Sequence, residues 1–110
     1  MKTLQNDLTT IEQSKRLLEL GVPKNSANHY YGKDGNLYYI DGTIPYSLLW
    51  EIGCTPCWSV GQLIEIARTC LEERRFKIFI ALMIWKNPIV QLMKLYEAFG
   101  KEVNFSKLED

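Results

Sequence analysis

Asn28-His-Tyr-Tyr-Gly-Lys-Asp-Gly-Asn-Leu-Tyr-Tyr-Ile40 is the stretch that decides the fold. Two tyrosine-rich runs flank the dipeptide Asp34-Gly35, which can take positive φ at both centres of a tight hairpin turn. Aromatic runs on either side of such a turn are typical of paired strands. The pattern predicts an antiparallel hairpin with strands at about 28–32 and 37–41.

The length of the hairpin loop decides which side chains are neighbours. If Asp34 and Gly35 alone form the loop, Tyr31 faces Tyr38 beside Lys33; a four-residue loop would change this pairing. One face of the ribbon covers the core, so this outer set is expected at the surface. Tyrosine offers rigid apolar area with a polar tip, which suits protein contacts or base stacking. Cross-strand tyrosines can also do no more than stabilise a hairpin.

Helices are predicted on both sides of the hairpin. Before it, Thr9 or Thr10 caps a helix from about Ile11 to Leu20 with capping-box spacing, and Gly21 ends it. After it, Pro45 opens a short helix at about 46–52, followed by a loop at 54–59.

Two longer helices follow in the second half of the chain. Ser59 is the clearest N-cap, with Gln62 at the third helical position. Its helix carries an apolar face of Val60, Leu63, Ile64, Ala67, Cys70 and Leu71. Asn87-Pro88 begins the last helix, at about 88–99.

The run Phe76–Trp85 lacks polar alternation, which favours a strand covered on both faces. Together these elements predict an α+β fold: a small, mostly antiparallel sheet that includes the Tyr-rich hairpin, with three main helices packed on it. We expect a flexible leader at 1–9, a single domain at 10–100 and a polar tail at 101–110.

Composition narrows the function classes. The 110 residues include 13 basic and 13 acidic side chains, so the usual basic excess of a nucleic-acid binder is absent. The N-terminal stretch lacks the apolar run of a secretory signal, and the longest apolar run, Ile78–Trp85, is far below the ~20 residues that span a membrane. Three cysteines are an odd number, so at least one stays unpaired, and without a secretory signal we expect reduced thiols in a cytoplasmic protein.

Cys54-x-x-Cys57 is the sharpest chemical motif, because two thiols at this spacing can exchange with a disulfide. Thr55-Pro56 between them is similar to the motif of thioredoxin-like proteins, although Ser59, not a cysteine, occupies the helix cap. A zinc site would need Cys70 and His29 as further ligands, and no second paired motif supports one, so we expect no metal. Packing of two small side chains beside Trp58 is the simpler interpretation.

Catalytic signatures are otherwise missing from the sequence. It holds no Gly-rich phosphate loop, no HExxH and no GxSxG, and a single histidine leaves little for acid–base chemistry. We therefore expect no cofactor and favour a protein that is not an enzyme.

Three stretches carry a family resemblance: EQSKRLLELG at 12–21, PCWSVGQLIE at 56–65 and NPIV at 87–90. They resemble a family of small uncharacterised proteins from gut Bacteroidetes and their phages or mobile elements. In that family an EQSK-type helix, a Tyr-bearing segment, a Pro-x-Trp-Ser-Leu helix start and an Asn-Pro final helix recur in this order. The similarity spans about residues 10–97 and implies a fold more than a function, because no activity is established for the family.

The expected function is a non-enzymatic binding or accessory module of a bacterial or phage system that contacts another protein. Tyr31, Tyr38, Lys33 and Trp50 are the candidate binding residues, and a homodimer is compatible with exposed aromatics at zero net charge. The alternatives are a thiol–disulfide protein that uses Cys54 and Cys57, and a nucleic-acid-associated phage factor.

Overall fold

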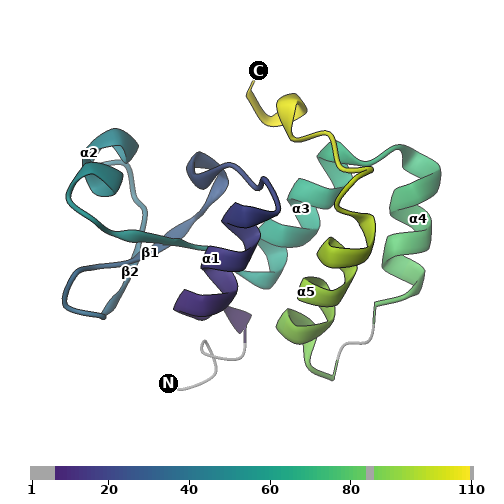
Figure 1. The fold of residues 1–110 in the computed structure, drawn as a ribbon, viewed down its shortest axis with the longest axis horizontal. Helices are drawn as coiled ribbons and strands as arrows, with labels where there is room; N and C mark the ends of the chain where they lie inside the picture. Colours follow the sequence, from purple (N-terminus) through teal and green to yellow (C-terminus); the bar gives the residue numbers. More distant parts are fainter. Residues whose placement is uncertain (1–6, 84–85, 110) are drawn as a thin grey trace.

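The computed structural model describes residues 7–83 and 86–109. It is an α+β fold, as predicted, with a small antiparallel sheet at one end and packed helices at the other (Figure 1). The helices are α1 (Ile11–Glu19), α2 (Tyr46–Glu51), α3 (Val60–Cys70), α4 (Glu73–Ala81) and α5 (Pro88–Phe99). The strands are β1 (His29–Tyr31), β2 (Leu37–Tyr39) and β3 (Thr55–Cys57), and two 3₁₀ turns are η2 (Lys24–Ser26) and η3 (Phe105–Glu109).

The sheet has the order β2-β1-β3, and both pairings are antiparallel. In the central strand β1, His29 lies opposite Tyr39 of β2 and Cys57 of β3. β3 is a correction, because the segment that contains it was predicted as a loop. Proline is compatible with β3 because β3 is an edge strand that pairs only with β1. The position of Pro56, which has no N–H, can therefore face away from the hydrogen-bonded ladder.

The hairpin loop contains three residues, 33–35, not the two or four considered from the sequence. The Gly32 amide donates to the Asn36 carbonyl at 2.9 Å, which closes the ladder around that loop. Gly35 alone takes a positive φ, of 81°, so the turn is of the kind that ends in a glycine bulge. The extra residue shifts the register by one, so Tyr30 faces Tyr38 and Tyr31 faces Leu37.

Local sequence signals account for both ends of α1 and for the starts of α2, α3 and α5. Thr10 and Gln13 form the predicted capping box at α1, and Gly21 ends that helix at a φ of 102°. Ser59 accepts the Gln62 amide at the start of α3. Pro88 opens α5 as predicted, although the Asn87 side chain makes no capping bond there.

α4 corrects the predicted strand at Phe76–Trp85, of which Ile84 and Trp85 lie outside the described residues. The apolar residues that face the core recur at helical spacing: Phe76, Phe79, Ile80 and Met83. Short apolar runs fit a buried strand or a buried helix, and here the helix lets Phe79 bury completely.

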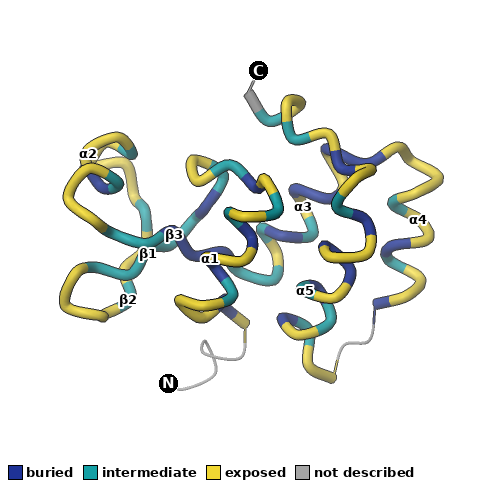
Figure 2. Tube along the Cα trace, in the orientation of Figure 1, coloured by how far each residue is buried: buried dark blue, intermediate teal, exposed yellow. Residues whose placement is uncertain are grey.

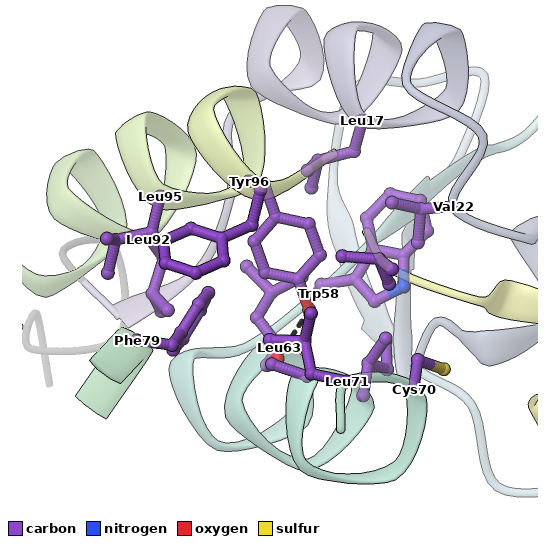
Figure 3. Packing of buried hydrophobic residues seen from close by; sticks show 14 of the residues in the cluster. Leu17, Val22, Trp58, Leu63, Cys70, Leu71, Phe79, Leu92, Leu95 and Tyr96 are labelled. Atoms are coloured by element: carbon purple, nitrogen blue, oxygen red, sulfur yellow. Dashed lines mark hydrogen bonds between the residues drawn. The ribbon is translucent and has the colours of Figure 1, made fainter. Parts of the chain in front are cut away.

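The main core lies between α1, α3, α4 and α5 rather than on the sheet (Figure 2). Trp58, which directly follows β3, is fully buried at its centre beside Leu17 and Val22 (Figure 3). On its other side Tyr96 donates its hydroxyl proton to the Leu63 carbonyl at 2.5 Å. Trp58 thus joins the sheet end of the molecule to the helical end.

Both ends of the described chain belong to the folded domain. The domain therefore extends beyond the predicted range of 10–100 at each end. Leu8 and Thr9 are buried, and the Thr9 amide donates to the Trp58 carbonyl at 3.0 Å. At the other end Val103 is buried and the Asn104 amide donates to the Cys70 carbonyl at 3.0 Å. The segments predicted as leader and tail therefore both contribute side chains to the core.

Candidate binding surface

Exposed apolar side chains concentrate in one segment of the chain, although Tyr38 and Tyr39 lie on opposite faces of the sheet within it. Of the nine large hydrophobic residues that are exposed in the described chain, five fall in the segment 38–52. We call this set the hairpin–α2 surface: Tyr38, Tyr39, Ile44, Leu48 and Ile52. The same region is mostly exposed along its backbone trace, at the end of the molecule opposite α4 and α5 (Figure 2).

Helix α2 presents its half of this surface through its short amphipathic turn. Leu49 is the buried residue that anchors it, at 1% exposure. Leu48 and Ile52 lie four residues apart, so they share a helix face, and they are 44% and 46% exposed. Gly53 ends the helix at a φ of 94° and turns the chain toward β3.

Trp50 lies on a different side of α2, where it is held in place. Its indole N–H donates to the Asn25 side-chain oxygen at 2.8 Å, and its ring centre lies 6.0 Å from that of Tyr46. With Lys24 and Ser47 among its neighbours, it lines an open cavity of about 410 Å³. A tryptophan tethered in this way is a rigid contact group that loses little entropy on binding.

Tyr38 is exposed and also fixed. Its ring stacks on Tyr30 with 5.2 Å between centres, and its hydroxyl donates to the Asp34 carboxylate at 2.7 Å. That hydrogen bond raises the pKa of Tyr38. The pKa of Asp34 is lowered, first by the hydrogen bond from the Asn36 amide and then by the one from the Tyr38 hydroxyl. Lys33 lies exposed at the same hairpin tip, with its alkyl chain beside Gly53.

Tyr31 does not join Tyr38, which corrects the outer set expected from the two-residue loop. Because side chains alternate along a strand, Tyr31 lies on the sheet face opposite to Tyr30 and Tyr38. Its hydroxyl donates to the Thr9 carbonyl at 2.8 Å, and burial raises its pKa to about 12. The structure therefore keeps Tyr38 and Lys33 at the hairpin end and uses Tyr31 to hold the chain entering α1.

Three members of the surface were missed in the sequence, namely Ile44, Leu48 and Ile52. A signal for them was present, because their spacing of four continues through the predicted short helix.

The cysteines are dispersed and free of disulfides in the described chain. Cys54 precedes β3 and is partly exposed, whereas Cys57 is the last residue of β3 and is buried. Burial raises the pKa of the Cys57 thiol, whereas thiol–disulfide exchange needs a thiolate stabilised near neutral pH.

The groups considered for zinc are also separated. Cys70 is buried on α3, whereas His29 lies opposite Cys57 in the sheet. Among the described residues, no three side chains of His, Cys, Asp or Glu converge as metal ligands would.

His29 is a residue of the sheet whose titration near neutral pH has a clear consequence for stability. Its Nδ1 is buried without a hydrogen-bond partner among the described residues, and its ring meets Tyr39 edge-on. Burial lowers its pKa below the ordinary 6.5, because the imidazolium form loses hydration. The unfolded chain therefore takes up a proton more readily than the folded one.

The free energy of unfolding should consequently be highest above about pH 6.5 and fall as the pH drops below that value. Urea unfolding at pH 7, 6 and 5 measures this slope, and His29→Gln should flatten it. The lowered pKa values of Asp34, Asp41 and Glu97 place their contributions at lower pH, so they do not mask the effect. Equal slopes in the two proteins would contradict the assignment.

Charges near the exposed aromatics do not suit a phosphate backbone. Asp34 and Asp41 have lowered pKa values, so both are ionised at neutral pH beside Tyr38 and Tyr39. Lys33 is the cation of the hairpin tip. A nucleic-acid groove requires clustered cations along its path.

No helix in the described part of the chain is long and apolar enough to cross a membrane. In comparisons with known proteins, no family model, curated protein sequence or solved structure matches this chain.

Proposed function

We propose that this protein is a binding module that contacts another protein through the hairpin–α2 surface. The observation that carries the proposal is the concentration of exposed apolar side chains in the segment 38–52. Isolated exposed hydrophobics are ordinary on a protein surface, but grouped ones are typical of contact sites.

The form of the surface supports this function. Tyr38 is stacked on Tyr30 and bonded to Asp34, so an aromatic contact group of this surface is already ordered in the free protein. Rigid aromatic side chains are enriched among the residues that contribute most binding energy in interfaces. Placement of the module in a bacterial or phage system rests on the sequence resemblance alone.

The test compares two matched pairs of aliphatic residues. Leu48→Glu with Ile52→Glu places charge on the hairpin–α2 surface, and Ile78→Glu with Leu82→Glu makes the same change on α4. The pairs match in spacing and exposure, at 44% and 46% against 41% and 53%. We expect the α2 pair to reduce partner recovery about tenfold or more, because burying an unpaired charge costs several kcal/mol and about 1.4 kcal/mol is already tenfold in affinity.

The measurement is quantitative affinity capture from the native host, with far-UV circular dichroism to show that each variant is folded. Recovery of the same partners at the same yield by the α2 pair would refute the proposed surface. Loss of partners with the α4 pair instead would move the contact site to the other end of the molecule.

A further inference from the structure

Strand β2 has an outer edge whose hydrogen-bonding groups are unused in the described structure. The Gly32 amide bonds to the Asn36 carbonyl, and the Ile40 amide to the Asn28 carbonyl. In an antiparallel ladder the groups alternate, so residues 36, 38 and 40 face β1 while Leu37 and Tyr39 direct their N–H and C=O away from it. β2 is the edge of the three-stranded sheet, and in Figure 1 it lies at the outside of the molecule.

We propose that two copies of this chain associate through this edge, antiparallel and with the two-fold axis at Tyr38. In that register Leu37 pairs with the second copy's Tyr39, and Tyr39 with the second copy's Leu37. Each of these pairs exchanges two backbone hydrogen bonds, so all outward groups of both β2 strands are used. The two sheets become one continuous six-stranded sheet, and a symmetric pairing of this kind closes at two copies.

Side chains favour this register over the one centred on residue 37. With the axis at Tyr38, aromatic Tyr38 meets its own copy on one face and Tyr39 meets leucine on the other. Moving the axis to residue 37 would set Tyr39 against Gly35 and Tyr38 against Asn36. Aromatic and aliphatic cross-strand pairs stabilise a sheet, whereas glycine offers no side chain to pack.

The surroundings of the edge permit a close approach of two copies. Tyr39 is the most exposed of the large hydrophobic residues, at 66%, and pairing would cover it. Antiparallel alignment brings Lys33 at one hairpin tip toward the second copy's Asp41, whose lowered pKa keeps it ionised at neutral pH. The chain has a formal net charge of zero, so no long-range repulsion opposes association.

The edge is short, so the dimer should be weak and concentration-dependent. Sedimentation velocity from about 10 µM to about 1 mM, the range for weak interfaces, should show a monomer–dimer equilibrium. Hydrogen exchange on the unmodified protein locates the contact. The amides of Leu37 and Tyr39 should gain protection as concentration rises, while the amide of Tyr38, already bonded to β1, should stay constant and serve as the internal reference.

Two variants separate backbone pairing from side-chain contact. Tyr39→Ala removes the ring and keeps the outward N–H, whereas Tyr39→Pro removes both and is compatible with an edge strand. We expect the dissociation constant of Tyr39→Pro to exceed that of Tyr39→Ala about tenfold or more, because each dimer loses two backbone hydrogen bonds. Equal constants would overturn the proposal.

Sedimentation as a monomer over the whole range would also overturn it, as would a dimer in which Leu37 and Tyr39 gain no protection. The dimer is measured without any other protein, so its failure leaves the proposed partner contact through α2 standing. Conversely, the double variant Leu48→Glu with Ile52→Glu changes residues outside the paired strands, and we expect its dimerisation to be unchanged.

Discussion

Trp58→Ala should lower the free energy of unfolding by about 3–5 kcal/mol, the range for deleting a fully buried large aromatic side chain. Trp58 has no exposed surface, and its indole N–H donates to the Ser26 hydroxyl at 3.0 Å. The substitution therefore leaves a cavity at the centre of the core and a hydroxyl without its donor. A domain of this size is typically stable by about 5–15 kcal/mol, so much of the folding free energy is lost.

Position matters here as well as size, because Trp58 is packed by elements from both halves of the molecule. Leu17 of α1, Leu63 of α3 and Tyr96 of α5 belong to the same buried cluster. A cavity surrounded by three helices cannot be closed by moving any one of them, and poor relaxation makes such cavities costly.

Trp50→Ala is the matched control, since it removes the same side chain from the surface. Trp50 is only partly buried, and the substitution removes the hydrogen bond from its indole N–H to Asn25, so the expected cost is about 1 kcal/mol. Urea denaturation followed by far-UV circular dichroism measures both variants without relying on tryptophan fluorescence. A loss below about 1 kcal/mol for Trp58→Ala would show that the core repacks around the gap.

The contrast between the two tryptophans shows what the sequence could predict. Trp58 precedes the N-cap Ser59, a position from which an apolar side chain typically packs back onto the helix that follows. Local signals also gave both ends of α1 and α5 and the start of α3, since caps and helix stops depend on residues close in the chain.

Features that depend on distant partners were the ones missed. The run that became α4 fits a strand or a helix until its neighbours are known, and Phe79 buries only because α3 and α5 receive it. The loop length in the hairpin depends on whether Asp34 adopts a positive φ, and here it does not. That single residue moved Tyr31 away from Tyr38 and changed the candidate site.

Thr9 shows the same dependence on distant contacts, and its substitution is expected to cause the second large loss of folding stability. It lies in the segment predicted as a leader, yet it is fully buried. Its hydroxyl accepts the Trp58 amide at 3.1 Å and lies 2.8 Å from the buried Ser14 hydroxyl. Its carbonyl accepts from the Tyr31 hydroxyl at 2.8 Å and from the Cys57 thiol at 3.2 Å. One residue thus joins β1, β3 and α1.

Thr9→Val should lower the free energy of unfolding by about 2–3 kcal/mol, because it leaves the buried Trp58 amide without its acceptor. Valine matches the shape of threonine, so lost packing contributes little to this change. Thr9→Ser is the complementary control: it keeps the hydroxyl and removes only a methyl group, for an expected loss of about 1 kcal/mol.

The order of the two variants is the decisive result, measured by urea denaturation under identical conditions. If Thr9→Val is the more destabilised, the buried hydrogen bonds dominate at this position. If Thr9→Ser is destabilised more, shape rather than hydrogen bonding holds the segment entering α1 against the sheet. In that case the Trp58 amide would have to find water, which its complete burial in the folded protein argues against.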